Sequence, residues 1–136
     1  MAGRILIVED DQMNVRFMSF VLERKGGFEV LVSEDVYEIL KIAKDASLSA
    51  IIMDISLPNS KHNDKNVDGI YITKLLKADP ETAAIPVIIA TAHAMIGDRE
   101  HFLEESKAEH YISKPIYDPN AFFDEVAGVI SGVLQT

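Results

Sequence analysis

The sequence predicts an α/β domain in which helices cover both faces of a five-stranded parallel sheet. The chain has 136 residues, of which 48% are apolar, enough for one buried core. Short apolar runs rich in β-branched residues alternate five times with segments of helical spacing. Such alternation favours right-handed βαβ crossovers and a parallel sheet. We therefore expect a single domain over residues 1–136.

The first predicted strand is a continuous apolar run, as expected of a strand buried on both faces, and similar runs recur along the chain. Such a run differs from the alternating pattern of a strand that is exposed on one face. The five runs lie at residues 5–8, 28–32, 50–53, 86–90 and, less apolar, 110–113.

The predicted helices have apolar residues at every third or fourth position. The first contains Met13, Phe17 and Val21 and ends at the pair Gly26 and Gly27. The others contain the apolar positions of residues 36–43, 72–76, 96–106 and 122–133. With the five strands, these five helices complete a doubly wound fold.

One polar segment, residues 59–66, interrupts this alternation and is long for a connection between a strand and a helix. It predicts a loop insertion without an apolar anchor. His62, Asp64 and Asp68 are candidates for a second metal site, but polar loops commonly collect such residues and no spacing fixes their geometry.

Composition excludes several classes of function. Acidic residues number 22 against 13 basic ones, giving a net charge of −9, and no basic cluster predicts direct binding to nucleic acid. The absence of cysteine excludes disulfides and thiolate metal sites. We find no signal-peptide core and no apolar run near the ~18 residues of a membrane span. The expectation is a cytoplasmic protein that does not bind membranes.

Charged and polar residues follow four of the five predicted strands. Since the carboxyl ends of parallel strands share one edge of the sheet, these residues are expected to lie together. An acidic triplet after one strand is commonly only a solvated turn or a helix cap, but the whole set has a shared chemistry. The residues are Glu9, Asp10 and Asp11 after the first run, Asp54 after the third, Thr91 after the fourth and Lys114 after the fifth.

The converging carboxylates predict a divalent cation. Two carboxylates about 4 Å apart repel by roughly 4 kcal/mol at an effective dielectric near 20, so Glu9, Asp10 and Asp54 need a compensating charge. Oxygen ligands select Mg²⁺, with Mn²⁺ as the alternative, and Mg²⁺ leaves coordination positions for phosphate oxygens. An aspartate at such a site can accept a phosphoryl group while a lysine neutralises the phosphoryl oxygens.

Five motifs in order resemble the receiver domain of two-component response regulators. The similarity runs from about residue 4 to residue 134, and it is nearest to the stand-alone receivers of the chemotaxis-regulator and cell-cycle-regulator type, which have no output domain. It implies a flavodoxin-like sheet of strand order 2-1-3-4-5 with five helices. The motifs are residues 5–11 (ILIVEDD), 52–58 (IMDISLP), 67–69 (VDG), 88–92 (IIATA) and 111–115 (YISKP).

The resemblance implies a phosphorylation site centred on Asp54, the phosphoacceptor. Asp10 and Asp54 are expected to bind Mg²⁺ together with the backbone carbonyl of Ser56, with Glu9 acting through metal-bound water. Asp11 is expected to cap or solvate the following helix. His93 and Ser56 occupy positions that border the phosphoryl group in this family.

The resemblance also implies a switch. Thr91 and Lys114 are expected to contact the phosphoryl group, and Tyr111 to move between exposed and buried positions as Thr91 is recruited. The bond between Lys114 and Pro115 is expected to be cis.

Two departures from the family pattern stand out. Nine residues separate Pro58 from Asp68 where the family usually has two, an insertion of seven. Lys107 replaces the glycine that usually precedes the last strand. Because a lysine is strained at positive φ, we expect the end of the preceding helix to be reshaped.

The function implied is a signalling switch that takes a phosphoryl group from a sensor histidine kinase or a histidine phosphotransfer protein. An unidentified downstream target protein is expected to bind the surface of the fourth helix, fifth strand and fifth helix. The chain would catalyse only its own phosphorylation and dephosphorylation. One alternative is a Mg²⁺-dependent aspartyl-phosphate phosphatase, but Ser56 stands where such enzymes often carry a second aspartate. The other is a receiver-like module that only binds.

Overall fold

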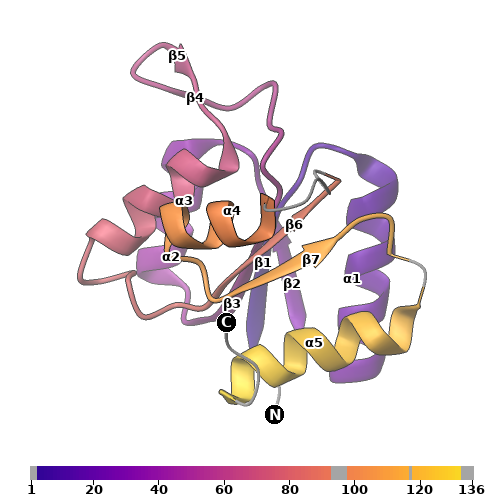
Figure 1. Cartoon of the computed structure of the whole chain (residues 1–136). Helices are drawn as coiled ribbons and strands as arrows, with labels where there is room; N and C mark the ends of the chain where they lie inside the picture. Colours follow the sequence, from indigo (N-terminus) through magenta and orange to yellow (C-terminus); the bar gives the residue numbers. More distant parts are fainter. Residues whose placement is uncertain (1–2, 93–97, 117, 133–136) are drawn as a thin grey trace.

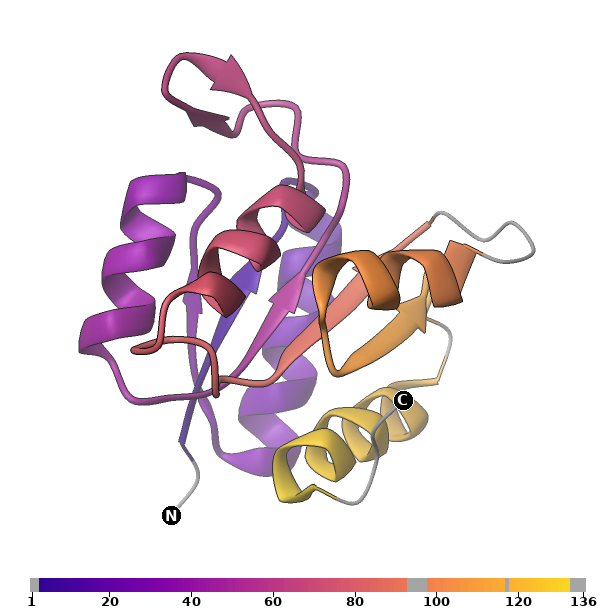
Figure 2. The same ribbon diagram turned by 60° about the vertical axis from the view of Figure 1, so that its left-hand side comes forward.

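A five-stranded parallel sheet forms the centre of the computed structural model, which describes residues 3–92, 98–116 and 118–132 (Figures 1 and 2). The order β2-β1-β3-β6-β7 is the predicted order 2-1-3-4-5, because β4 and β5 belong to a separate hairpin. The fold prediction is confirmed. The sheet strands are β1 (Arg4–Val8), β2 (Glu29–Val32), β3 (Leu48–Met53), β6 (Val87–Thr91) and β7 (His110–Ser113).

In the described part of the chain, five helices cover the two faces of the sheet. On one face α1 (Gln12–Gly26) and α5 (Pro119–Ser131) pack together. On the other lie α2 (Val36–Asp45), α3 (Gly69–Ala78) and α4 (Asp98–Ser106). His93, which the sequence places near the phosphoryl group, lies outside the described residues. No helix in the described ranges is long and apolar enough to cross a membrane.

The sheet divides the core into two layers. Along β1, Leu6 and Val8 point into the layer beneath α2, α3 and α4, while Ile5 and Ile7 point into the layer beneath α1 and α5. Each of these side chains is fully buried. Since burial of one such side chain contributes about 1.5–3 kcal/mol, the apolar run is explained by two buried faces.

Local sequence sets the ends of α1. Asp11 Oδ1 accepts hydrogen bonds from the backbone N–H groups of Met13 at 2.9 Å and Asn14 at 3.4 Å, which makes Asp11 the N-cap. Gly27 follows the helix at φ 67°, and its N–H donates to the carbonyl of Glu23. The predicted cap and the predicted glycine stop are both confirmed.

The inserted segment is a hairpin of β4 (Lys61–His62) and β5 (Lys65–Asn66), not an unanchored loop. Asn63 and Asp64 connect its strands at φ 54° and 64°, the backbone conformation that two-residue hairpin turns require. The His62 ring lies between Tyr37 of α2 and Tyr71 of α3, with centroids 5.4 and 5.5 Å away. The expectation that this segment lacks an anchor is wrong, because two helices supply aromatic rings distant in sequence.

The end of α4 keeps the conformation that a glycine would adopt. Lys107 has φ 67°, and its N–H donates to the carbonyl of Leu103 at 2.9 Å. The buried Ser106 hydroxyl accepts the next N–H, from Ala108, at 3.1 Å. The expected reshaping of this helix end is wrong: the bonded turn is retained, with a lysine in the left-handed region.

Gly69, the first residue of α3, lies directly against the backbone that follows β3. Its N–H donates to the carbonyl of Ile55 at 2.9 Å. A Cβ atom at this position would come within 1.9 Å of the Asp54 carbonyl oxygen. Only glycine allows α3 to begin this close to Asp54.

Replacing Lys107 with glycine is expected to stabilise the protein by about 1 kcal/mol. The left-handed conformation costs a residue with a Cβ roughly 1–2 kcal/mol, and part of this gain is offset because glycine has more conformational entropy in the unfolded chain. Thermal melting should show a rise of about 3–4 °C. Glu104→Gly, in the exposed interior of the same helix, should lower the melting temperature instead. An unchanged or lower value for Lys107→Gly would contradict the strain.

Gly69→Ala is expected to destabilise the fold by about 1–3 kcal/mol, since the added methyl group pushes the start of α3 away from the backbone of Asp54. Amide chemical shifts at Asp54 and Ile55 should change. Gly132→Ala is the control, because φ is 81° there but nothing lies within 4 Å of the Cβ position. Gly132→Ala should lower stability without changing the chemical shifts of Asp54 and Ile55. If Gly69→Ala changed neither stability nor those shifts, the close approach of Gly69 to the Asp54 backbone would be contradicted.

Candidate functional site

A cleft of about 980 Å³ lies at the carboxyl edge of the sheet. Its walls come from the ends of β1, β3, β6 and β7 and from the segment between the hairpin and α3. Six of the seven predicted site residues line it, and Tyr111 does not. The lining residues are Glu9, Asp10, Asp11, Asn14, Asp54, Ser56, Leu57, Pro58, Asn66, Val67, Asp68, Thr91, Ala92, Lys114 and Pro115.

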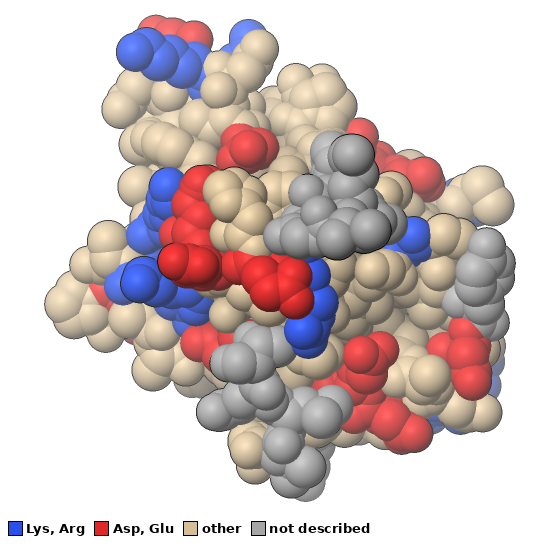
Figure 3. All heavy atoms as spheres, viewed as in Figure 1, with Lys and Arg blue, Asp and Glu red and all other residues tan. Residues whose placement is uncertain are grey.

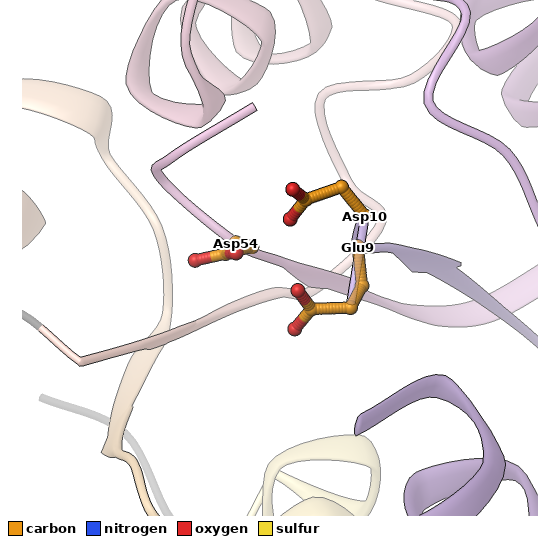
Figure 4. Close-up of side chains that lie close together, drawn as sticks. All are labelled: Glu9, Asp10 and Asp54. Carbon is orange, nitrogen blue, oxygen red and sulfur yellow. The ribbon is translucent and has the colours of Figure 1, made fainter. Parts of the chain in front are cut away.

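Three carboxylates meet in this cleft. Glu9 and Asp10 extend from the end of β1 toward the side on which Asp54 follows β3 (Figure 4). One oxygen from each lies within 4.8 Å of the others. Glu9 is 3% exposed and Asp54 is 7% exposed, so water screens their charges poorly. The group is an oxygen-rich, negatively charged ligand set of the kind that Mg²⁺ binds.

Lys114 provides the cation inside this group. Its ammonium donates a hydrogen bond to Glu9 Oε1, and its Nζ lies 3.5 Å from Asp54 Oδ2. The Lys114 side chain is only 8% exposed. Burial, together with the negative charge of Asp54, raises the pKa of Glu9 above its ordinary value, although Lys114 favours the ionised form. In this cluster, three carboxyl groups lie beside a single lysine.

The backbone ladder brings these side chains to one edge. Val8 pairs with Met53, and the N–H of Asp54 donates to the carbonyl of Val8 at 2.9 Å. Between β6 and β7, the backbone N–H of Lys114 donates to the carbonyl of Thr91 at 2.9 Å. The bond between Lys114 and Pro115 is cis, as the family resemblance implies.

Thr91 and Tyr111 lie on the neighbouring strands β6 and β7. The buried Thr91 borders the cleft. Tyr111 is buried on the α3 and α4 side of the sheet, and its ring stacks on Phe102 of α4 with centroids 6.4 Å apart and an interplanar angle of 18°. Of the two positions of Tyr111 that the resemblance implies, exposed and buried, the structure has the buried one.

The remaining candidates are placed as follows. Ser56 lines the cleft with an exposed side chain. Asp68 caps α3, its Oδ1 accepting the N–H of Tyr71 at 2.9 Å. Within the described ranges, Glu9, Asp10 and Asp54 form the group of three or more acidic or histidine ligands that could hold a metal, so a second site at His62, Asp64 and Asp68 is not supported.

Sequence reasoning missed Asn14 and Asn66, which also line the cleft. The first-turn position of Asn14, directly after the acidic triplet, was a usable indication of its place. Asn66 ends the inserted segment, which the sequence places beside the site, but no local pattern singles it out as a residue that lines the cleft.

Comparison with known proteins identifies the family. Residues 5–127 match the model of the response regulator receiver domain. The polar-differentiation response regulators DivK of Brucella ovis and Brucella suis are each 38% identical to this chain over 119 residues, covering 88% of this chain and 89% of theirs.

Solved structures agree with this result. The receiver domain of the sensor histidine kinase PA1611 from Pseudomonas aeruginosa PAO1, with a magnesium ion coordinated in its active-site cleft, matches with a TM-score of 0.78 and 27% identity over 96% of this chain and 99% of that one. A CheY-like receiver domain protein from Methanospirillum hungatei JF-1 has the same fold, with a TM-score of 0.77 and 23% identity over 98% of this chain and 97% of that one.

These matches cover nearly the whole chain, and they agree with the strand order and with the acidic cleft that follows β1 and β3. Receiver domains are signalling modules of two-component phosphorelays, and they bind Mg²⁺ at an acidic site of this kind. The chain belongs to the response regulator receiver family.

Proposed function

We propose that Asp54 accepts a phosphoryl group from the phosphohistidine of a sensor histidine kinase or a histidine phosphotransfer protein, and that the modified chain signals by binding a target protein. The observation that carries this proposal is the meeting of Glu9, Asp10, Asp54 and Lys114 in one cluster in which Glu9, Asp54 and the Lys114 side chain are buried. The proposal places the protein in the cytoplasm, where its kinase partner acts.

In the proposed reaction, one Asp54 carboxylate oxygen attacks phosphorus as the bond to the histidine nitrogen breaks. The imidazole leaves with the bonding electron pair and takes up a proton from water. Bound Mg²⁺, or Mn²⁺ in its place, supplies positive charge to the phosphoryl oxygens. Asp10, Asp54 and the backbone carbonyl of Ser56 would hold the ion, and Glu9 would hold its water.

Two cleft residues contact the transferred group in this proposal. Lys114 already lies 3.5 Å from Asp54 Oδ2, so its ammonium is placed to neutralise charge that develops on the phosphoryl oxygens. Thr91 donates its hydroxyl to one of those oxygens. Since Thr91 lies one strand from Tyr111, this hydrogen bond would change the packing of Tyr111 against α4 and so the target-binding surface of α4, β7 and α5.

The alternatives receive less support. A phosphatase acting on outside substrates would need a carboxylate for acid and base catalysis two positions after Asp54, where the chain has Ser56. We propose instead that the chain catalyses only its own phosphorylation and dephosphorylation. A module that only binds would not need a buried lysine beside an aspartate at the end of β3.

Incubation with Mg²⁺ and acetyl phosphate is expected to add one phosphoryl group to the chain, because the small phosphodonor needs only the cleft. Intact-mass spectrometry measures the addition, and both excess chelator and Asp54→Asn should abolish it. Asp11→Asn is the matched control, since asparagine still caps α1. Undiminished labelling of Asp54→Asn would contradict the assignment of the phosphoacceptor.

Lys114→Ala and Thr91→Ala are expected to separate chemistry from switching. Loss of the Lys114 charge should slow labelling by about 10²-fold, the usual cost of one preorganised electrostatic contact. Thr91→Ala removes a single hydroxyl, worth about 1 kcal/mol, so labelling should persist within about five-fold. When Asp54 is labelled, the NMR chemical shifts of Tyr111 and α4 should change in wild type and should change much less in Thr91→Ala. Equal movement would contradict the switch.

A further inference from the structure

The hairpin of β4 and β5 stands at the rim of the proposed phosphorylation cleft. Both views show it extending past the rest of the chain at the end where the sheet strands finish (Figures 1 and 2). The chain on either side of it lines the cleft, through Leu57 and Pro58 before β4 and Asn66, Val67 and Asp68 at its end. The hairpin is thus continuous with one wall of the cleft that contains Asp54.

Packing against two helices holds the hairpin in place. His62 lies between Tyr37 and Tyr71, and its Nδ1 is 2.7 Å from the Tyr71 hydroxyl oxygen. The Tyr37 hydroxyl donates to Asn63 Oδ1 at 3.3 Å, and the Tyr37 hydroxyl oxygen accepts a hydrogen bond from the backbone N–H of Asn63 at 3.4 Å. These contacts order the turn of the hairpin in the free protein.

The base of the hairpin is closed as well. The N–H of Val67 donates to the carbonyl of Ser60 at 3.0 Å, and the buried Ser60 hydroxyl donates to the carbonyl of Glu34 at 2.6 Å. Asn59 also donates to the Glu34 carboxylate, at 3.2 Å. A segment ordered in advance loses little conformational entropy when a partner binds it.

The hairpin carries positive charge on an acidic protein. Lys61 and Lys65 are exposed, neither lines the cleft, and neither forms an ion pair with any described residue. Asp64 is the single acidic residue between them, in a chain of net charge −9. Figure 3 shows blue with a smaller red area on the hairpin at the top of the view, and red gathered over α4 in the middle.

A protein that phosphorylates Asp54 must cover this rim. Because Asp54 is only 7% exposed, the phosphohistidine has to enter the cleft, and the surface around it then lies against the cleft walls. The hairpin extends from one of those walls. A small phosphodonor such as acetyl phosphate enters without touching it.

We propose that the β4–β5 hairpin is a docking arm for the phosphodonor protein, and that Lys61 and Lys65 contact an acidic patch beside the phosphohistidine of that protein. This inference rests on the proposed function and names the partner surface it uses. Exposed charges at the edge of an interface act mainly on the encounter rate, so the contacts select the phosphodonor protein without altering the chemistry at Asp54.

The test compares two phosphodonors on matched variants. The probe is the histidine phosphotransfer domain that phosphorylates wild type fastest in a panel of purified, prephosphorylated domains. Lys61→Glu/Lys65→Glu should lower its second-order transfer rate about ten-fold at low salt, with the gap closing at high salt, while the maximal rate stays unchanged. Arg24→Glu/Lys25→Glu makes the same charge change at the far end of α1, and it should transfer as wild type does.

Labelling by acetyl phosphate separates the two ideas. If no variant and not even wild type is labelled at Asp54, the proposed function fails. If labelling is normal but the hairpin reversal leaves protein transfer and its salt dependence unchanged, the docking arm is wrong. The arm is also wrong if sedimentation shows that the reversal alters only self-association, because the hairpin would then face a second copy of the chain.

Shortening residues 59–67 to two residues provides a second variant. The shortened chain should fold and accept a phosphoryl group from acetyl phosphate. Its transfer rate from the phosphotransfer domain should fall, as it does in the charge-reversal variant. If the shortened chain does not fold, the charge reversal still decides the question. Wild-type transfer by a folded shortened chain would overturn the proposal.

Discussion

A cluster of like charges at the carboxyl edge of the sheet, two of its three carboxylates buried, is the feature on which the proposed function depends. One carboxylate oxygen from each of Glu9, Asp10 and Asp54 lies within 4.8 Å of the others, and the burial of Glu9 and Asp54 weakens screening of their charges. Lys114 lies among them and balances part of that charge. In the proposed function, the remaining carboxylates would hold a divalent cation and, through that cation, a phosphoryl group.

Packing of the sheet positions the strand ends that carry this cluster. The strands β1, β3, β6 and β7 are largely buried, so two apolar layers hold the strand ends that carry the charged residues. The parallel ladder then delivers residues from four strands to one edge. Gly69 completes the arrangement, because it lets α3 begin against the backbone of Asp54. The charge cluster is thus supported by this packing.

The proposed chemistry and the proposed choice of partner use separate parts of the molecule. The cleft residues come from the sheet edge, whereas the hairpin is attached to α2 and α3 through Tyr37, His62 and Tyr71. An added segment of this kind changes the rim of the cleft and leaves the strand ends as they are. In this view a shared phosphorylation site serves different partners because the surfaces around it vary.

The sequence by itself determined the elements and the edge at which the charged residues meet, because apolar runs, the Asp11 cap and the stop at Gly27 are local patterns. The wall that Asn66 adds to the cleft, the aromatic contacts of His62 and the left-handed Lys107 were decided by the tertiary structure. Contacts between Tyr37 and the hairpin join residues 26 positions apart, which no local pattern encodes. Lys107 keeps its conformation because the turn after α4 is held by the packing around Ser106 and Ala108, which outweighs the preference of a single lysine.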